Sequence, residues 1–318
     1  MSPKTIAMMF PGQGSQKPGM GKAAADANPS AAALFEEADR ILERPISRLC
    51  FEGPEEELRQ TIHTQPALFV TEAALLEVLR EEGFEPSIVA GHSLGEYTAL
   101  YAAGVFDFET GLRLVDQRAR LMDEAGRAQP GAMAAILKLD RDRALGICKR
   151  ASVKGVIVAA NWNSPEQVVV SGEPEAVDEA VRLAKEAGSR RSQRLAVSGA
   201  FHSPLVQSAC DRMRPILDRA PMRPPSCTFV ANVSARAVED VATIRQNLGD
   251  QIVQCVLWIE SVQAMARHGA EVFVEVGPGK VLTGLLRRID PELKGVHVSV
   301  PDEVATVRET LETSARQQ

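Results

Sequence analysis

The sequence has few aromatic residues, fewer basic than acidic residues, no long apolar run and few cysteines, and each of these argues against a class of function. Aromatic residues make up only 4% of the 318 residues, too few for the stacking surfaces that bind single-stranded nucleic acid. Lys and Arg number 36 against 42 Asp and Glu, a net charge of −6, whereas nucleic-acid binders are basic. No apolar run approaches the roughly 18 residues of a membrane span. We therefore expect a protein that binds neither nucleic acid nor membrane.

Cysteines are few and scattered. The five are odd in number and form no Cys-x-x-Cys pair, so they favour small buried side chains over a zinc site. They are Cys50, Cys148, Cys210, Cys227 and Cys255. The N-terminal region has one short apolar run, residues 6–10, without the layout of a signal peptide. We expect a cytoplasmic protein with no bound metal.

Apolar residues reach 45%, enough for a large core. Strand-like runs alternate with helical patterns along most of the chain, which predicts an α/β fold with a mostly parallel sheet. One of these helices is predicted to open at Gln65-Pro66 and to end before Gly83. Residues 131–197 instead follow the order β-α-β-β-α-β, with the last strand at 192–197, which is a ferredoxin-like arrangement. We predict a core of residues 1–130 and 198–318 and an inserted subdomain at 131–197.

The stretch Gly91-His92-Ser93-Leu94-Gly95 lies between a strand-like run and a helix-like run. Strand, sharp turn and helix is the setting of a nucleophile elbow. The glycines flank a turn that a Cβ would obstruct, and the serine lies at a helix N-terminus, where free N–H groups favour negative charge. The alternative is a tight strand-to-helix turn with an incidental serine.

A serine nucleophile needs a base, and a neutral imidazole is the usual one. Of five histidines, His202 alone lies in a glycine-containing loop where the chain returns from the predicted insert, the expected wall of a cleft. A structural histidine is the alternative. His92, next to Ser93, is expected to point elsewhere. Because no acidic residue between Ser93 and His202 stands out, we expect a backbone carbonyl or an amide to orient His202.

Arg118 interrupts the apolar face of a predicted helix, between Leu114 and Met122. A buried arginine must be paired, since an isolated buried charge is very costly. Its partner is either a carboxylate of this protein or one carried by a ligand, which the planar guanidinium can bind with two hydrogen bonds. The residues alone therefore indicate an acyl-group enzyme, and leave transfer and hydrolysis unseparated.

Six segments, in this order, resemble the malonyl-CoA:acyl-carrier-protein transacylases and the freestanding acyltransferases of polyketide synthases. They are Phe10-Pro11-Gly12-Gln13-Gly14-Ser15-Gln16, Thr64-Gln65-Pro66-Ala67-Leu68, Gly91-His92-Ser93-Leu94-Gly95-Glu96-Tyr97, Asn161-Trp162-Asn163-Ser164-Pro165, Gly199-Ala200-Phe201-His202-Ser203 and Glu275-Val276-Gly277-Pro278-Gly279-Lys280-Val281-Leu282. The resemblance covers residues 5–290. It implies an α/β-hydrolase-like core with a ferredoxin-like insert, and ping-pong transfer in fatty-acid or polyketide synthesis. Malonyl would pass from malonyl-CoA to Ser93 and then to the phosphopantetheine thiol of acyl carrier protein, with no cofactor of the enzyme's own.

The resemblance also implies roles for individual residues. Ser93 is the nucleophile and His202 the general base and then acid. The backbone N–H groups of Gln13 and Leu94 form the oxyanion hole, and Arg118 binds the malonyl carboxylate. The substrate pocket is assigned to Gln65, Asn163, Phe201 and His92. Phe201 favours malonyl over methylmalonyl, a difference of one methyl worth about 1–3 kcal/mol.

Two rival functions and one departure from the family pattern accompany this hypothesis. An acyl hydrolase of the same fold would gain nothing from a cation at Arg118, and a non-catalytic docking module would not need the full set of site residues. Residues 254–258 lack the Asn-Pro-Val found in many relatives, where this loop lies beside the catalytic histidine.

Acyl carrier protein, the expected partner of a monomeric enzyme, is acidic, so docking needs a local basic patch. The candidates are Arg190-Arg191 with Arg194, and Arg287-Arg288. Solvated charge runs are the alternative interpretation of both.

Overall fold

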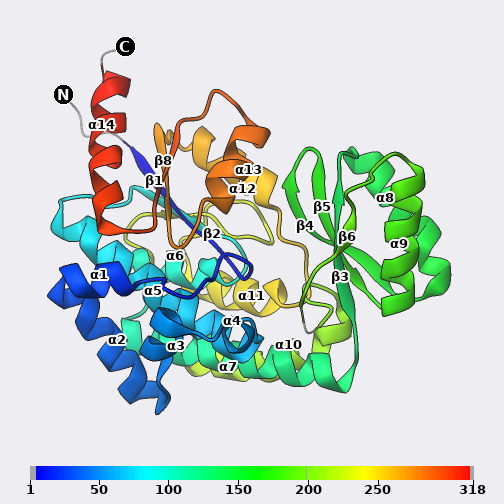
Figure 1. The fold of residues 1–318 in the computed structure, drawn as a ribbon, viewed down its shortest axis with the longest axis horizontal. Coiled ribbons are helices and arrows are strands. Elements are labelled where there is room, and N and C mark those ends of the chain that lie inside the picture. Colours follow the sequence, from blue (N-terminus) through cyan, green and yellow to red (C-terminus); the bar gives the residue numbers. More distant parts are fainter. Residues whose placement is uncertain (1–4, 198, 316–318) are drawn as a thin grey trace.

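The computed structural model describes residues 5–197 and 199–315, which form two sheets with helices around them (Figure 1). The larger sheet has the strand order β7-β2-β1-β8-β9. Its strands are β1 (Ile6–Phe10), β2 (Ile88–Gly91), β7 (Thr228–Phe229), β8 (Val272–Val276) and β9 (Gly295–Val298). All of its strand pairs are parallel, which confirms the predicted α/β fold with a parallel sheet.

The large sheet is covered on both faces, and every residue of β1, β2 and β8 is buried. On one face the core includes Met8 and Phe10 and the helices α5 (Thr61–Glu81), α6 (Gly95–Ala102) and α7 (Phe108–Ala128). On the other, Ala7 and Met9 pack against α12 (Trp258–Arg267) and α13 (Val281–Ile289). This two-sided burial explains why the strands are continuous apolar runs in the sequence.

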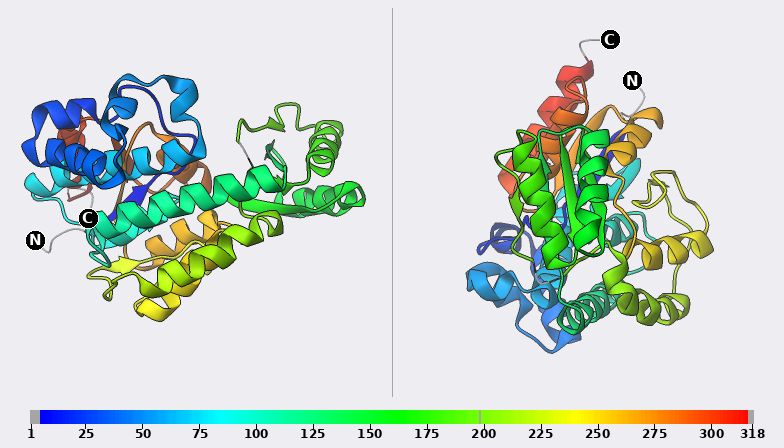
Figure 2. Two further views of the ribbon diagram at one scale, coloured as in Figure 1. Left: turned by 90° about the horizontal axis from the view of Figure 1, so that it is seen from below. Right: turned by 90° about the vertical axis from the view of Figure 1, so that its right-hand side faces the viewer.

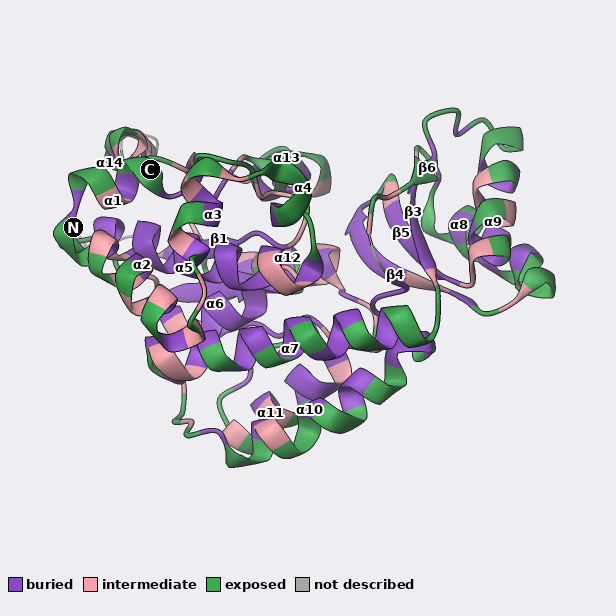
Figure 3. Cartoon of the chain, turned by 60° about the horizontal axis from the view of Figure 1, so that its bottom comes forward, coloured by how far each residue is buried: buried purple, intermediate pink, exposed green. Residues whose placement is uncertain are grey.

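The remaining helices of the large body pack around these elements, and the last of them in the chain contacts β8 and β9 directly (Figure 2). They are α1 (Lys22–Ala27), α2 (Pro29–Leu42), α3 (Ile46–Glu52), α4 (Glu55–Leu58), α10 (Gln207–Arg219), α11 (Val241–Gln251) and α14 (Val304–Ala315). Figure 3 shows α7 buried along one side and exposed along the other, as its sequence pattern predicts. No helix within residues 5–197 and 199–315 has both the length and the apolar character needed to cross a membrane.

The smaller sheet is antiparallel and has the order β4-β5-β3-β6. Its elements follow one another as β3 (Ala132–Leu137), α8 (Arg141–Ala151), β4 (Ile157–Ser164), β5 (Gln167–Gly172), α9 (Pro174–Glu186) and β6 (Gln193–Arg194). This is the predicted ferredoxin-like arrangement, with a core of its own. The predicted extent of the last strand is wrong: β6 spans only Gln193–Arg194. Leu195 N still donates to Met133 O of β3 at 2.8 Å, but the side chains of Leu195 and Val197 pack on the large core.

The predicted domain limits are consistent with this arrangement but stay a prediction. The strands of the small sheet fall within 131–197, and those of the large sheet fall outside it. Residues 1–4, 198 and 316–318 of the predicted core lie outside the described residues.

The prediction that a helix begins at Gln65-Pro66 is wrong. The helix α5 begins at Thr61 and contains Pro66 in its interior. A proline inside a helix leaves the carbonyl four residues earlier without its N–H partner. Here Arg44 Nη1 donates to that carbonyl, Ile62 O, at 3.4 Å. The helix therefore continues through the proline.

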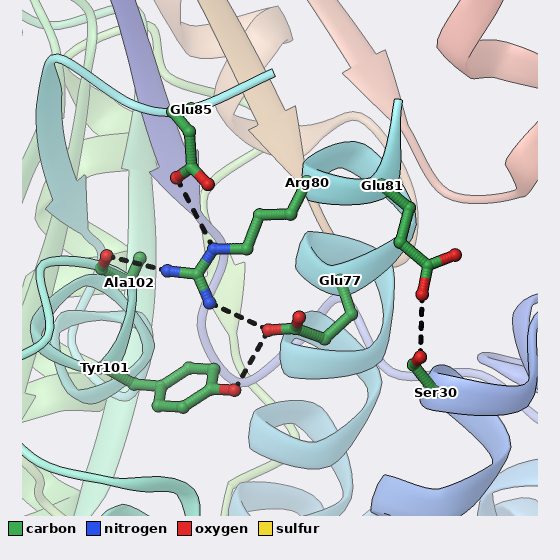
Figure 4. A network of polar contacts seen from close by, with 7 residues as sticks. All are labelled: Ser30, Glu77, Arg80, Glu81, Glu85, Tyr101 and Ala102. Atoms are coloured by element: carbon green, nitrogen blue, oxygen red, sulfur yellow. Dashed lines mark hydrogen bonds and ion pairs between the residues drawn. The ribbon is translucent and has the colours of Figure 1, made fainter. Parts of the chain in front are cut away.

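The helix that follows Ser93 is anchored at its far end (Figure 4). Arg80 on α5 donates to Ala102 O of α6 at 3.0 Å and pairs with Glu77 at 2.7 Å. Glu77 also accepts from Tyr101 Oη at 3.1 Å. These contacts fix α6, and with it the turn at Ser93, against α5.

Candidate active site

Ser93 lies in a sharp turn between β2 and α6, with a backbone φ of 54°. A Cβ on Gly91 would lie 1.8 Å from the carbonyl oxygen of Gly95, and one on Gly95 would lie 2.0 Å from that of Phe10. Only glycine fits at either position. A serine held in the left-handed region beside a helix N-terminus is the geometry of a nucleophile elbow.

Ser93 Oγ lies 2.8 Å from His202 Nε2, and His202 Nδ1 lies 2.7 Å from the carbonyl oxygen of Gln251. Because a carbonyl only accepts, Nδ1 carries the proton and Nε2 is free to accept from the serine hydroxyl. Burial, and then the charge of Arg118, lower the pKa of His202 to about 3. The imidazole is therefore neutral at neutral pH and can take a proton.

The carbonyl 2.7 Å from His202 Nδ1 comes from the end of α11, and the backbone of Gln254 adds a smaller interaction with the same imidazole that also raises its pKa. The rest of the loop at residues 254–258 runs along β4: Val256 N donates to Ala160 O, and Trp162 N donates to Val256 O, each at 2.9 Å. His202 N donates to Ile252 O at 3.0 Å, which holds the histidine beside the helix end. A carbonyl partner was one of the two predicted possibilities, but its residue was not predicted.

Arg118 is 1% exposed and reaches the nucleophile from α7. Its Nη1 donates to Gln65 Oε1 at 2.6 Å, and its Nη2 donates to Ser93 Oγ at 3.1 Å and to Gln251 Oε1 at 2.8 Å. Among the residues that the structure describes, no Asp or Glu lies within ion-pair distance of it, and Nε has no hydrogen-bond partner. The internal salt bridge, one of the two alternatives for Arg118, is therefore not formed.

A cleft of about 590 Å³ lies over Ser93, between the large body and the small sheet. It is lined by all nine predicted site residues, namely Gln13, Gln65, His92, Ser93, Leu94, Arg118, Asn163, Phe201 and His202. His92 turns away from Ser93, with Nε2 2.8 Å from Asn163 Oδ1 and its ring edge-on to Trp258. Phe201 is buried in the wall.

Two backbone donors next to Ser93 are unused within the described parts of the chain. Neither Gln13 N nor Leu94 N donates to another described residue, and both residues line the cleft. The Gln13 side chain is held aside by Thr61, at 3.3 Å. Such N–H groups can stabilise an oxyanion that forms at the serine.

Three site residues were missed by the sequence analysis. Asn232 Oδ1 accepts from Ser93 N at 2.8 Å, and Asn232 Nδ2 donates to Gly91 O at 2.6 Å. Gln251 contacts Arg118 and His202, as described above. Glu96 is buried and accepts from the backbone N–H of Asn232 and from Gln251 Nε2. Asn232 and Gln251 follow no motif, so only the fold brings them here. Glu96 could have been found, as an acidic residue in the first turn of an otherwise apolar helix.

The chain resembles known proteins over nearly its whole length. The family model described as acyl transferase domain matches residues 8–299. The malonyl CoA-acyl carrier protein transacylase of Bacillus subtilis strain 168 is 42% identical over 307 residues, 96% of this chain and 97% of that protein.

Two solved structures are similar as well. That of the malonyl CoA-acyl carrier protein transacylase of Coxiella burnetii is 36% identical, with a TM-score of 0.94 over 97% of this chain and 98% of that one. A malonyl-transacylase in complex with its type II PKS acyl-carrier protein is 40% identical, with a TM-score of 0.93 over 98% of this chain and 100% of that one. The chain therefore belongs to the acyl transferase domain family and, within it, to the malonyl CoA-acyl carrier protein transacylases.

Proposed function

We propose that the protein transfers the malonyl group of malonyl-CoA to the phosphopantetheine thiol of an acyl carrier protein. The observation that carries this proposal is Arg118, a buried guanidinium that pairs with no carboxylate among the described residues and lies 3.1 Å from Ser93 Oγ. A carboxylate bound there holds the thioester carbonyl of the same short acyl group beside the serine. A hydrolase of plain acyl chains gains nothing from this cation, so the geometry favours the malonyl transacylase.

The first half-reaction forms an ester on Ser93. Oγ attacks the thioester carbon while His202 Nε2 takes the hydroxyl proton. The oxyanion accepts hydrogen bonds from Gln13 N and Leu94 N. When the intermediate collapses, the C–S bond breaks and the CoA sulfur leaves with the proton from His202.

The second half-reaction repeats these steps in reverse. The phosphopantetheine thiol gives its proton to His202, its sulfur attacks the ester carbon, and Ser93 Oγ leaves and takes the proton back. The reaction needs no cofactor of the enzyme's own, because the partner carries the phosphopantetheine. All of these groups come from one chain, so we propose a monomer. Five unpaired thiols suit the proposed cytoplasmic location.

We propose Arg287 and Arg288 as the docking patch for the acidic carrier protein. Arg288 Nη1 donates to Gln167 Oε1 at 3.2 Å, and Gln167 lines the cleft. In the other candidate patch, Arg194 is already paired with Asp178, at 2.5 Å. Charge reversal at Arg287 and Arg288 should raise the KM for carrier protein and leave that for malonyl-CoA unchanged.

The same reversal at Arg190 and Arg191 is the comparison. If only this second pair changes the KM for carrier protein, the docking patch lies on the small sheet. If neither pair changes it, both assignments are wrong.

The activity is tested by mixing the protein with malonyl-CoA, without carrier protein, and measuring its intact mass. A malonyl adduct on the wild type that is absent from Ser93→Ala supports the ester intermediate, and its transfer on addition of carrier protein supports the complete reaction. Release of free CoA without an adduct indicates hydrolysis instead. If neither an adduct nor free CoA is formed, malonyl-CoA is excluded as the donor.

A further inference from the structure

Glu96 is a buried acidic residue that contacts neighbours of the reacting groups rather than the reacting groups themselves. The reaction described above does not use it. It lies in the first turn of α6 and is 0% exposed. Glu96 Oε1 accepts from Asn232 N at 2.8 Å, and Oε2 accepts from Gln251 Nε2. Within the described residues, no Lys, Arg or His lies within ion-pair distance of it. Both partner residues contact the site: the Asn232 side chain accepts from Ser93 N, the Gln251 side chain accepts from Arg118, and the Gln251 backbone carbonyl accepts from His202.

Glu96 is one of three groups that set which way the Gln251 amide points. Gln251 Nε2 faces two acceptors, Glu96 Oε2 and, at 2.8 Å, Ser93 O, while Gln251 Oε1 faces a donor, Arg118 Nη2. Rotating the amide by half a turn would set oxygen against oxygen and N–H against N–H. The donor and the two acceptors around the amide, Glu96 among them, therefore exclude that orientation.

The Gln251 amide also lies between two buried ionisable groups, the carboxyl of Glu96 and the guanidinium of Arg118. Burial raises the pKa of Glu96 to about 7 and lowers the pKa of Arg118, and the charge of each group partly offsets the shift of the other. A direct ion pair would occupy the guanidinium and compete with an incoming carboxylate. With the amide between them, Arg118 keeps a countercharge while Nε stays without a hydrogen-bond partner among the described residues.

We propose that Glu96 is a positioning residue for the selection of the acyl group: acting through Gln251, it holds and counterbalances Arg118 without covering the guanidinium that an acyl carboxylate must reach. This inference rests on the proposed function. It assigns to Glu96 a role in choosing malonyl over uncharged acyl groups, separate from the chemistry of Ser93 and His202.

The test compares loading of malonyl-CoA and acetyl-CoA by Glu96→Gln. The new amide sets an N–H against the donor of either Gln251 or Asn232, so the network loses its present orientation. We expect kcat/KM for malonyl loading to fall so far that the malonyl-to-acetyl ratio drops at least tenfold. Glu72→Gln is the matched control: Glu72 is also 0% exposed and bonded to α6, through Thr98, but contacts none of the three site side chains. Its ratio should stay at the wild-type value.

A double-mutant cycle decides whether Glu96 acts through Arg118. In an Arg118→Ala background, Glu96→Gln should leave the ratio unchanged. The inference is overturned if Glu96→Gln slows both substrates equally, if its effect adds to that of Arg118→Ala, or if the ratio rises. A rise would mean that Glu96 mainly repels the malonyl carboxylate.

Two further measurements keep the test decisive. If Glu96→Gln fails to fold, Gln251→Met removes the connecting amide, and an unchanged ratio there overturns the inference equally. Wild-type protein in the same assay separates the two proposals. If the wild type does not load malonyl, the proposed function is wrong, and so is this inference. If the wild type loads malonyl normally and the malonyl-to-acetyl ratio of the variants does not change as expected, only the role of Glu96 is wrong.

Discussion

Replacing Arg118 by alanine should reverse the acyl preference of the enzyme. A planar guanidinium can give a carboxylate two charge-assisted hydrogen bonds of about 1.5–3 kcal/mol each, or about 3–6 kcal/mol together. Since 1.4 kcal/mol corresponds to a factor of ten, kcat/KM for malonyl loading should fall by about 10²–10⁴. Acetyl-CoA carries no carboxylate, so its loading loses only the Nη2 contact with Ser93 Oγ.

The assay is the rate of acyl-enzyme formation, followed by intact mass at several concentrations of each CoA ester. Arg120→Ala is the matched control, because Arg120 lies on the same helix but is half-exposed and paired with Asp116. Equal slowing of both substrates by Arg118→Ala would refute the carboxylate-binding role. It would show that Arg118 acts through its contact with Ser93 Oγ and does not bind the acyl group.

The same variant has a second consequence, for pH dependence. The charge of Arg118 is one of the causes that lower the pKa of His202. Its removal should raise that pKa, so the imidazole becomes protonated, and unable to act as a base, at a higher pH. The acidic limb of the loading-rate profile should therefore move to higher pH. A limb that stays in place would contradict the electrostatic link between the two side chains.

Further predictions concern stability and selectivity. Gly95→Ala should lower the free energy of unfolding in urea by about 1–3 kcal/mol, because the new Cβ would lie 2.0 Å from Phe10 O. Gly146→Ala, in α8, places its Cβ in open space and should raise that free energy by about 0.5–1 kcal/mol. Equal effects of the two substitutions would contradict this. Phe201→Ser should raise loading of methylmalonyl-CoA relative to malonyl-CoA about tenfold; an unchanged ratio would remove Phe201 as the limit on size. Because the folded-state pKa of His202 is about 3 and the ordinary value is 6.5, the unfolded chain binds the proton first. Stability should therefore fall as the pH drops from about 6.5 towards 3, and His202→Gln should reduce that slope.

Local patterns predicted the parts of the site that depend on neighbouring residues. The turn at Ser93 could be predicted because its two glycines, strand and helix are adjacent in sequence, and Arg118 because it interrupts a helical apolar face. The carbonyl of Gln251 and the amide of Asn232 could not be predicted, because they reach Ser93 only through the packing of α11 and of the segment after β7. The predicted start of α5 was wrong because Arg44, which donates to Ile62 O, lies far from it in the sequence, between α2 and α3.

The position of β1 in the large sheet has a consequence for how the protein is made. β1 leaves the ribosome first, yet its neighbours are β2, at residues 88–91, and β8, at residues 272–276. Until β8 has been synthesised, a fully apolar strand has one edge without a partner, and such an edge is a template for aggregation. The edge of β1 therefore stays unpaired for most of the synthesis, and we expect a chain cut before β8 to be insoluble rather than partly active.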